Sequence, residues 1–151
     1  MSYESLDSDS PRYAIDPAWL EQQGRSMRAL AIERFCGESR RQLGEPAQRQ
    51  LAQADASGRV VFVTEEAPYG ENPFDVIAEC CSHKPDYIHR RLPLMEMLFR
   101  LFLASGNAPL TIEELQLRLQ EHYIDAVRDL SERTLQRMLD NDTFYGIQRS
   151  A

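Results

Sequence analysis

Hydrophobic residues in the last third of the chain recur at helical spacing and fall into three segments. The first, residues 92–103, is apolar on nearly every side and is interrupted only by Glu96 and Arg100, an opposite-charge pair four positions apart. The other two segments follow Thr111 and Ser131, and in each a leucine precedes the hydroxyl residue and another leucine lies four positions after it. A hydroxyl cap inside such a hydrophobic staple predicts the N-terminus of a helix.

This order of segments resembles a winged helix-turn-helix. Residues 92–103 correspond to its first helix, 111–123 to the positioning helix and 131–140 to the recognition helix, and residues 144–147 follow as one short wing strand. Seven residues separate the last two helices, more than a tight turn needs, and the chain ends before a two-stranded wing is complete. The resemblance implies a module that binds nucleic acid or other protein chains.

The third helix supplies the candidate binding residues. Leu135 and Leu139 lie on its apolar face, which turns Arg133, Gln136 and Arg137 outward. Arginine pairs with guanine and glutamine with adenine through two hydrogen bonds, so these three residues are the predicted nucleic-acid-binding site. One helix-turn-helix reads too few base pairs to be selective alone, and a homodimer is one arrangement compatible with this hypothesis.

The distribution of charge favours a different partner. The chain carries 24 acidic and 17 basic residues, a formal net charge of −7, and no segment is basic. Glu132, Asp140 and Asp142 flank the predicted reading face, and their charges oppose the approach of phosphate groups. An acidic adaptor that binds a protein partner without contacting DNA is therefore an open alternative.

The first 91 residues predict a helical region with one strand. Residues 1–11 combine serines and acids with little to bury, which is typical of a flexible tail, and residues 12–91 form the N-terminal region. The run at residues 59–64 is the only convincing strand, and we expect it to pair with residues 144–147. Residues 38–58 fit an exposed helix or a linker. Helices are predicted at residues 16–23, 26–35 and 74–81.

These elements give a mainly α fold with a small β element. Its C-terminal winged-helix-like three-helix unit spans residues 92–151. Apolar runs are too short to span a membrane, and the first fifteen residues lack the features of a signal peptide, so we expect a cytoplasmic protein with no membrane partner. The leading hypothesis is a small regulatory protein that binds DNA or a protein of the transcription machinery.

The cysteines support a third, weaker hypothesis, a thiol or metal-binding protein. Cys36, Cys80 and Cys81, with His83 and His89, carry the atoms that zinc prefers, but adjacent cysteines do not match a zinc spacing and Cys36 has no thiol near it in sequence. Burial as a small hydrophobe accounts for Cys81. No phosphate-binding loop or nucleophile–base pattern is recognisable, so we predict no metal, no cofactor and no enzyme activity.

Overall fold

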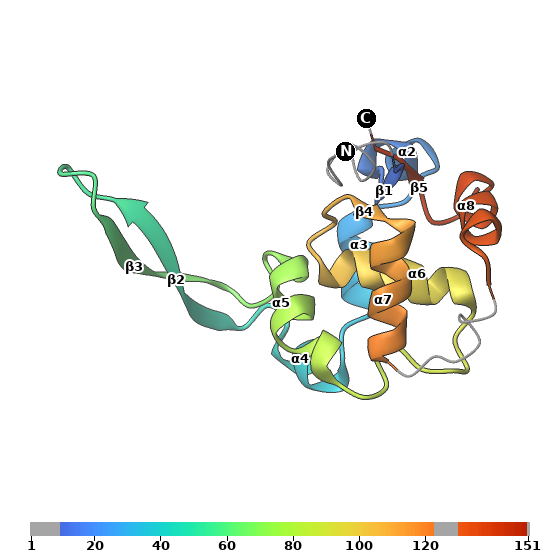
Figure 1. Ribbon diagram of the computed structural model, residues 1–151. Coiled ribbons are helices and arrows are strands. Elements are labelled where there is room, and N and C mark those ends of the chain that lie inside the picture. The colour runs from blue at the N-terminus through green and yellow to red at the C-terminus, as the bar shows by residue number, and fades with distance from the viewer. Residues whose placement is uncertain (1–9, 123–129, 151) are drawn as a thin grey trace.

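The computed structural model describes residues 10–122 and 130–150. They form a helical body from which a two-stranded β-hairpin projects (Figure 1). We call this hairpin, Pro46 to Pro68, the β-arm. In chain order the elements are β1 (Arg12–Ile15), α2 (Pro17–Gln22), α3 (Met27–Glu33), α4 (Gly37–Gln42), β2 (Pro46–Ala54), β3 (Val60–Pro68), α5 (Pro73–Glu79), a 3₁₀ turn (Cys81–His83), α6 (Leu94–Ala104), β4 (Leu110–Thr111), α7 (Ile112–Glu121), α8 (Glu132–Asp140) and β5 (Ile147–Arg149).

The apolar helix α6 forms the centre of the body, as its sequence predicts. Leu98, Phe99 and Phe102 are fully buried, and helices from both halves of the chain contribute buried side chains to the same core. A fully buried side chain of this size contributes roughly 1.5–3 kcal/mol through the hydrophobic effect. The body is therefore organised around one hydrophobic core.

Polar side chains mark the helix N-termini that the sequence predicts. Thr111 accepts the backbone N–H of Glu114 at 3.2 Å, and Asp16 accepts that of Ala18 at 3.0 Å. Each bond satisfies a backbone donor that has no partner within the helix. The predicted caps at the start of α2 and α7 are confirmed.

A three-stranded antiparallel sheet joins the two ends of the chain. Its strand order is β4-β1-β5, so the central strand comes from the N-terminal region. Tyr13 is opposite Leu110 on one side, and Ile15 is opposite Ile147 on the other. Tyr13 and Ile15 are both buried, which is the alternation expected when one face of a strand packs on the core. Strands β1 and β5, which are distant in sequence, therefore lie side by side (Figure 1).

The β-arm is a regular antiparallel ladder. Its register runs from Pro46 opposite Pro68 at the body to Ala54 opposite Val60 near the tip. At the tip the Asp55 carboxylate accepts the backbone N–H groups of Ser57 and Arg59, both at 2.9 Å. The glycine between these two residues, Gly58, has a φ of 86°, which other residues rarely adopt. Local turn chemistry therefore defines the tip.

The predicted fold class is wrong, because the described residues contain two sheets rather than one small β element. Seven α-helices accompany five strands, and the class is mixed α and β. The expected pairing of residues 59–64 with 144–147 is also wrong, since β3 pairs with β2 and β5 with β1. The segment interpreted as a helix or linker supplies β2, whose glutamines and alanines have low strand propensity and gave little signal.

Two expectations concern residues outside the described part of the chain. They are most of the tail predicted for residues 1–11 and the connection between α7 and α8, of which residues 123–129 are not described. The helices within the described ranges include none that is long and apolar enough to cross a membrane.

Candidate functional site

Helix α8 carries the residues that the sequence predicts to bind nucleic acid. It begins after Ser131, whose hydroxyl accepts the backbone N–H of Thr134 at 3.1 Å, so the predicted cap is confirmed. Leu135 and Leu139 are each 1% exposed and pack into the core. The helix is thus held by one apolar face, and its opposite face is solvated.

The structure places the predicted residues where their side chains can be reached. Arg133 and Arg137 are exposed and lie one helical turn apart, whereas Gln136 is half-buried between them. Within residues 10–122 and 130–150, none of these three side chains forms a hydrogen bond or an ion pair. Their role in binding nucleic acid stays a prediction.

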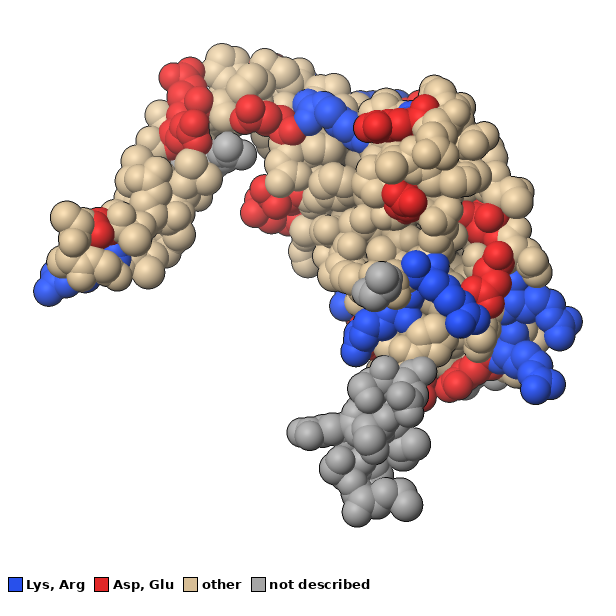
Figure 2. All heavy atoms as spheres, turned by 90° about the horizontal axis from the view of Figure 1, so that it is seen from above, with Lys and Arg blue, Asp and Glu red and all other residues tan. Residues whose placement is uncertain are grey.

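Carboxylates neutralise other cations near this helix. Arg149 donates two hydrogen bonds to Asp140, at 2.9 and 2.8 Å, and Arg12 forms an ion pair with Glu114 at 3.3 Å. Hydrogen bonding from Arg149 lowers the pKa of Asp140, which keeps this carboxylate charged. Blue and red side chains both lie on the end of the body farthest from the β-arm (Figure 2). Net positive charge at α8 is therefore small.

The β-arm presents the most concentrated apolar surface. Of the seven large hydrophobic residues that are exposed among the described residues, four lie on β3. Val60 and Phe62 are 68% and 69% exposed and share one face, while Val61 and Val63 lie on the other. The residues opposite Val60 and Phe62 on β2 are Ala54 and Ala52, which are too small to cover these two side chains.

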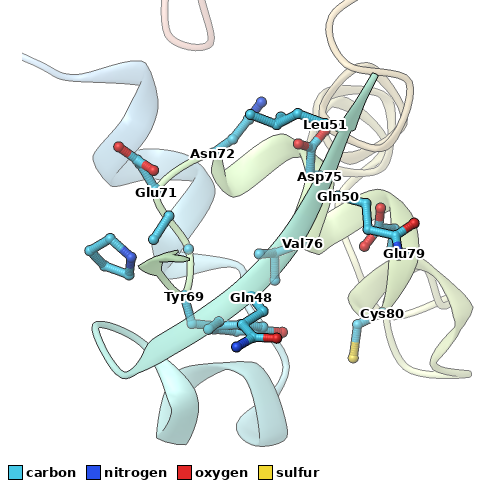
Figure 3. Close-up of a pocket in the computed structure, with 14 residues that line it drawn as sticks. Gln48, Gln50, Leu51, Tyr69, Glu71, Asn72, Asp75, Val76, Glu79 and Cys80 are labelled. Atoms are coloured by element: carbon cyan, nitrogen blue, oxygen red, sulfur yellow. The ribbon is translucent and has the colours of Figure 1, made fainter. Parts of the chain in front are cut away.

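A cavity of about 630 Å³ lies where the β-arm meets α5. Figure 3 shows Asp75, Val76 and Glu79 of α5 lining it together with Gln48 and Gln50 of β2. Amide, carboxylate and aliphatic groups line it together. Such a mixed lining does not identify one class of small ligand.

A group of thiols lies beside this cavity, and sequence analysis missed it. The prediction that Cys36 has no thiol near it is wrong in space, because its Sγ lies 3.7 Å from that of Cys80. The backbone N–H of Cys36 also donates to Cys81 Sγ at 3.2 Å. The fully buried hydroxyl of Ser39 lies 3.3 Å from Cys36 Sγ and 3.5 Å from Cys81 Sγ. We call Cys36, Ser39, Cys80 and Cys81 the thiol cluster.

Two of these thiols have shifted pKa values. Burial tends to raise the pKa of Cys36, but hydrogen bonds from the side chain and backbone of Ser39 and from the neighbouring thiols outweigh it and lower the value to about 7. Burial raises the pKa of Cys81, which is 1% exposed, as expected for a small buried hydrophobe. The Cys36 thiol is therefore more readily ionised near neutral pH than the Cys81 thiol.

The described residues contain no group of three or more histidine, cysteine, aspartate or glutamate side chains that could hold a metal ion. No family model matches the chain, and neither a curated protein nor a solved structure is significantly similar to it. Three features of the chain are candidates for its functional site: α8, the β-arm and the thiol cluster.

Proposed function

We propose that this chain is a regulatory protein-interaction module that binds its partner through the β-arm. The observation that carries this proposal is the exposure of Val60 and Phe62 on one face of β3, each to about two thirds. A two-stranded hairpin is marginally stable in water when nothing packs on it. A partner that covers the β-arm would bury these side chains and stabilise the ladder.

The partner that best fits this surface is a second copy of the chain. Within the described part of the chain, both strands of the β-arm have an edge that pairs with no other strand, and an edge rich in valine and phenylalanine pairs readily with another strand. If two β3 strands pair antiparallel about Phe62, Val61 of one copy faces Val63 of the other. Arg59 near the tip then lies beside the acidic Glu65 end of the other strand. Apolar and charged positions both match in this arrangement.

Sedimentation velocity over a range of concentrations tests this assembly. Wild-type protein is expected to dimerise, and Phe62→Glu should weaken the dimer at least tenfold by placing two like charges at its centre. The matched control is Leu117→Glu, which changes a leucine that is 60% exposed on α7 of the body and should leave the dimer intact.

Two outcomes would contradict the proposal at different levels. A wild-type chain that stays monomeric at about 100 μM would exclude the second copy as the partner and leave another protein as the occupant of the β-arm. A dimer that resists Phe62→Glu as well as Leu117→Glu would show that the β-arm is not the interface.

A second candidate function is binding of DNA, or of the transcription machinery, through α8. It is favoured by Arg133 and Arg137, which are exposed and have no carboxylate partner in the described ranges. The order of α6, β4, α7, α8 and β5 supports a winged-helix-like interpretation, with β1 in place of the second wing strand. A dimer would bring two α8 helices to one duplex, which adds selectivity.

Fluorescence anisotropy with a labelled mixed-sequence duplex tests this candidate. Affinity should fall as salt is raised, and Arg133→Ala combined with Arg137→Ala should weaken binding and reduce the salt dependence by about two phosphate contacts. Arg90→Ala with Arg91→Ala removes the same charge from another exposed site and is the control. Equal losses from the two double variants would mean that α8 has no specific role.

A further inference from the structure

The chain brings two partly exposed cysteines together across 44 positions of sequence. We propose that Cys36 and Cys80 are a redox-active pair that forms a reversible disulfide by exchange with low-molecular-weight disulfides. Their sulfur atoms lie 3.7 Å apart, and a disulfide bond is about 2.05 Å long. Cys36 directly precedes α4 and Cys80 directly follows α5, so neither lies in the interior of a helix that the bond would distort.

Cys36 is placed to be the attacking thiol. Ser39 is completely buried, and its Oγ is 3.1 Å from the hydroxyl of Tyr69. When Tyr69 donates to Ser39, the Ser39 proton is free to point at Cys36 Sγ, 3.3 Å away, and to stabilise the thiolate. This hydrogen bonding accords with a pKa of about 7 for Cys36. A thiol of that pKa combines a large thiolate fraction with good nucleophilicity at neutral pH.

Cys80 rather than Cys81 is placed to be the second thiol. Cys81 is 1% exposed, and its sulfur accepts the backbone N–H of Cys36 at 3.2 Å. Cys80 is partly exposed and lines the cavity at the base of the β-arm, so it can lose its proton to solvent before it attacks. The bond expected from this geometry links Cys36 to Cys80 and leaves Cys81 reduced.

Charged groups of both signs surround the pair. The Glu38 carboxylate lies 4.0 Å from Cys80 Sγ and forms an ion pair with Lys84 at 2.9 Å, so its negative charge is largely compensated. A smaller cavity of about 150 Å³ opens beside Cys36. The titratable residues that line this cavity with Cys36 and Cys81 are Glu33, Arg34, Arg40, Asp86, Tyr87 and Arg100.

The exchange proceeds in two balanced steps. The Cys36 thiolate attacks one sulfur of the external disulfide RSSR, a Cys36–SR bond forms, and RS⁻ leaves and takes up a proton. Cys80 then loses its proton to solvent and attacks the Cys36 sulfur, which releases the second RS⁻. The protein dithiol has lost two electrons and two protons, and one RSSR has become two RSH.

Formation of this bond would connect the two segments that support the β-arm. Between Cys36 and Cys80 lie α4, both strands of the β-arm and α5. The disulfide would therefore hold the two ends of this segment together at the body, without involving α8 or the three-stranded sheet.

Oxidation of the reduced full-length chain by glutathione disulfide, at a total protein concentration of about 1 μM, tests the pair directly. After quenching and unfolding with N-ethylmaleimide present, intact mass should show one labelled cysteine rather than three, and peptide mapping should show a Cys36–Cys80 link. Dithiothreitol should restore three labels. The rate should rise with pH and reach half its maximum near pH 7.

Variants separate the roles of the thiols. Cys80→Ser should stop at a mixed disulfide on Cys36, Cys36→Ser should form no link to Cys80, and Cys81→Ser should oxidise like wild type. Tyr69→Phe, which removes the group that orients Ser39, should move the midpoint of the rate profile to higher pH while the same link still forms. Glutathione adds its own mass, so each product is distinguishable by intact mass.

Three labelled cysteines after equilibration with excess glutathione disulfide would overturn the proposal. A mapped bond between Cys36 and Cys81, or between two chains, would do the same. Neither result bears on dimerisation through the β-arm, because sedimentation of the reduced protein tests that separately.

Discussion

The body and the β-arm are built on opposite principles. In the body, Phe102 is completely buried, and helices α6, α7 and α8 are each held by the apolar face that they turn to the core. In the β-arm, Phe62 is 69% exposed, and the strands are held by their ladder and by the turn at Asp55. The body therefore folds for its own stability, whereas the β-arm exposes apolar area that only a partner can bury.

A matched pair of phenylalanine variants gives the largest expected difference between these regions. Phe102→Ala leaves a cavity in the core and should lower the free energy of unfolding by about 3–5 kcal/mol. Phe62→Ala should change the stability of the monomer by less than about 0.5 kcal/mol, since it removes a mostly exposed side chain. Urea unfolding at a concentration that keeps the chain monomeric measures both. Similar losses would mean that the β-arm packs on the body.

The same contrast explains which elements the sequence predicts. Helices α7 and α8 begin at the caps Thr111 and Ser131, and the leucines that pack on the core lie only a few residues from each cap. Signals this close together in the sequence can be recognised without the structure. Strand β1 is only four residues long, and its partners begin far along the chain, β4 at Leu110 and β5 at Ile147. Nothing local to Tyr13 marks it as the centre of a sheet.

The candidate sites also differ in whether a local sequence pattern predicts them. Helical periodicity alone predicts that Arg133 and Arg137 lie on the outward face of their helix, and both are exposed in the structure. The approach of Cys36 to Cys80 depends on how α4 and α5 return to the body on either side of the β-arm, which no local pattern encodes. Strong strand propensity in residues 60–63 pointed to β3, but the glutamines and alanines of β2 concealed its partner.

Oxidation gives the next largest effect and tests how the two regions are joined. A disulfide that closes a loop of this length should raise the free energy of unfolding by about 2–4 kcal/mol, mainly by restricting the unfolded chain. Urea unfolding of oxidised and reduced protein measures the difference, and Cys80→Ser serves as the control that should show none. A link that lowers stability would mean that bond formation strains α4 or α5.

The body contains a partly buried network of charged side chains around Glu96. Among the described side chains of the β-arm there is no ion network that is buried to this extent. Glu96 accepts hydrogen bonds from Arg34 at 2.7 and 2.9 Å, from Arg100 at 2.9 Å and from Tyr145 at 3.2 Å. Glu96→Gln removes the charge that compensates two arginines and should cost about 1.5–3 kcal/mol at pH 7. Thermal or urea unfolding measures the loss.

The network also predicts that the stabilising contribution of Glu96 decreases at low pH. Burial would raise the pKa of Glu96, but hydrogen bonds from Arg34 and Arg100 outweigh it and lower the value. Its contribution is therefore fully present above the unfolded pKa of about 4.3 and is lost as pH falls through the lower folded value. The difference in the free energy of unfolding between wild type and Glu96→Gln should become smaller below about pH 4. A difference that stays constant would show that Glu96 acts through packing rather than charge.

The smallest effect should be confined to the β-arm. Gly58 has a φ of 86°, and a Cβ there would meet no atom within 4 Å, so Gly58→Ala adds backbone strain of about 1–2 kcal/mol without a steric clash. Because the tip can open while the body stays folded, global urea unfolding should hardly change. Amide hydrogen exchange at Gln53 and Val61, the next hydrogen-bonded pair of the ladder after Asp55 and Arg59, should accelerate roughly tenfold in a Phe62→Glu background, which keeps the β-arm unpartnered. If exchange in the core accelerated equally, the β-arm and the body would unfold as one cooperative unit, and the distinction between them would describe shape rather than energetics.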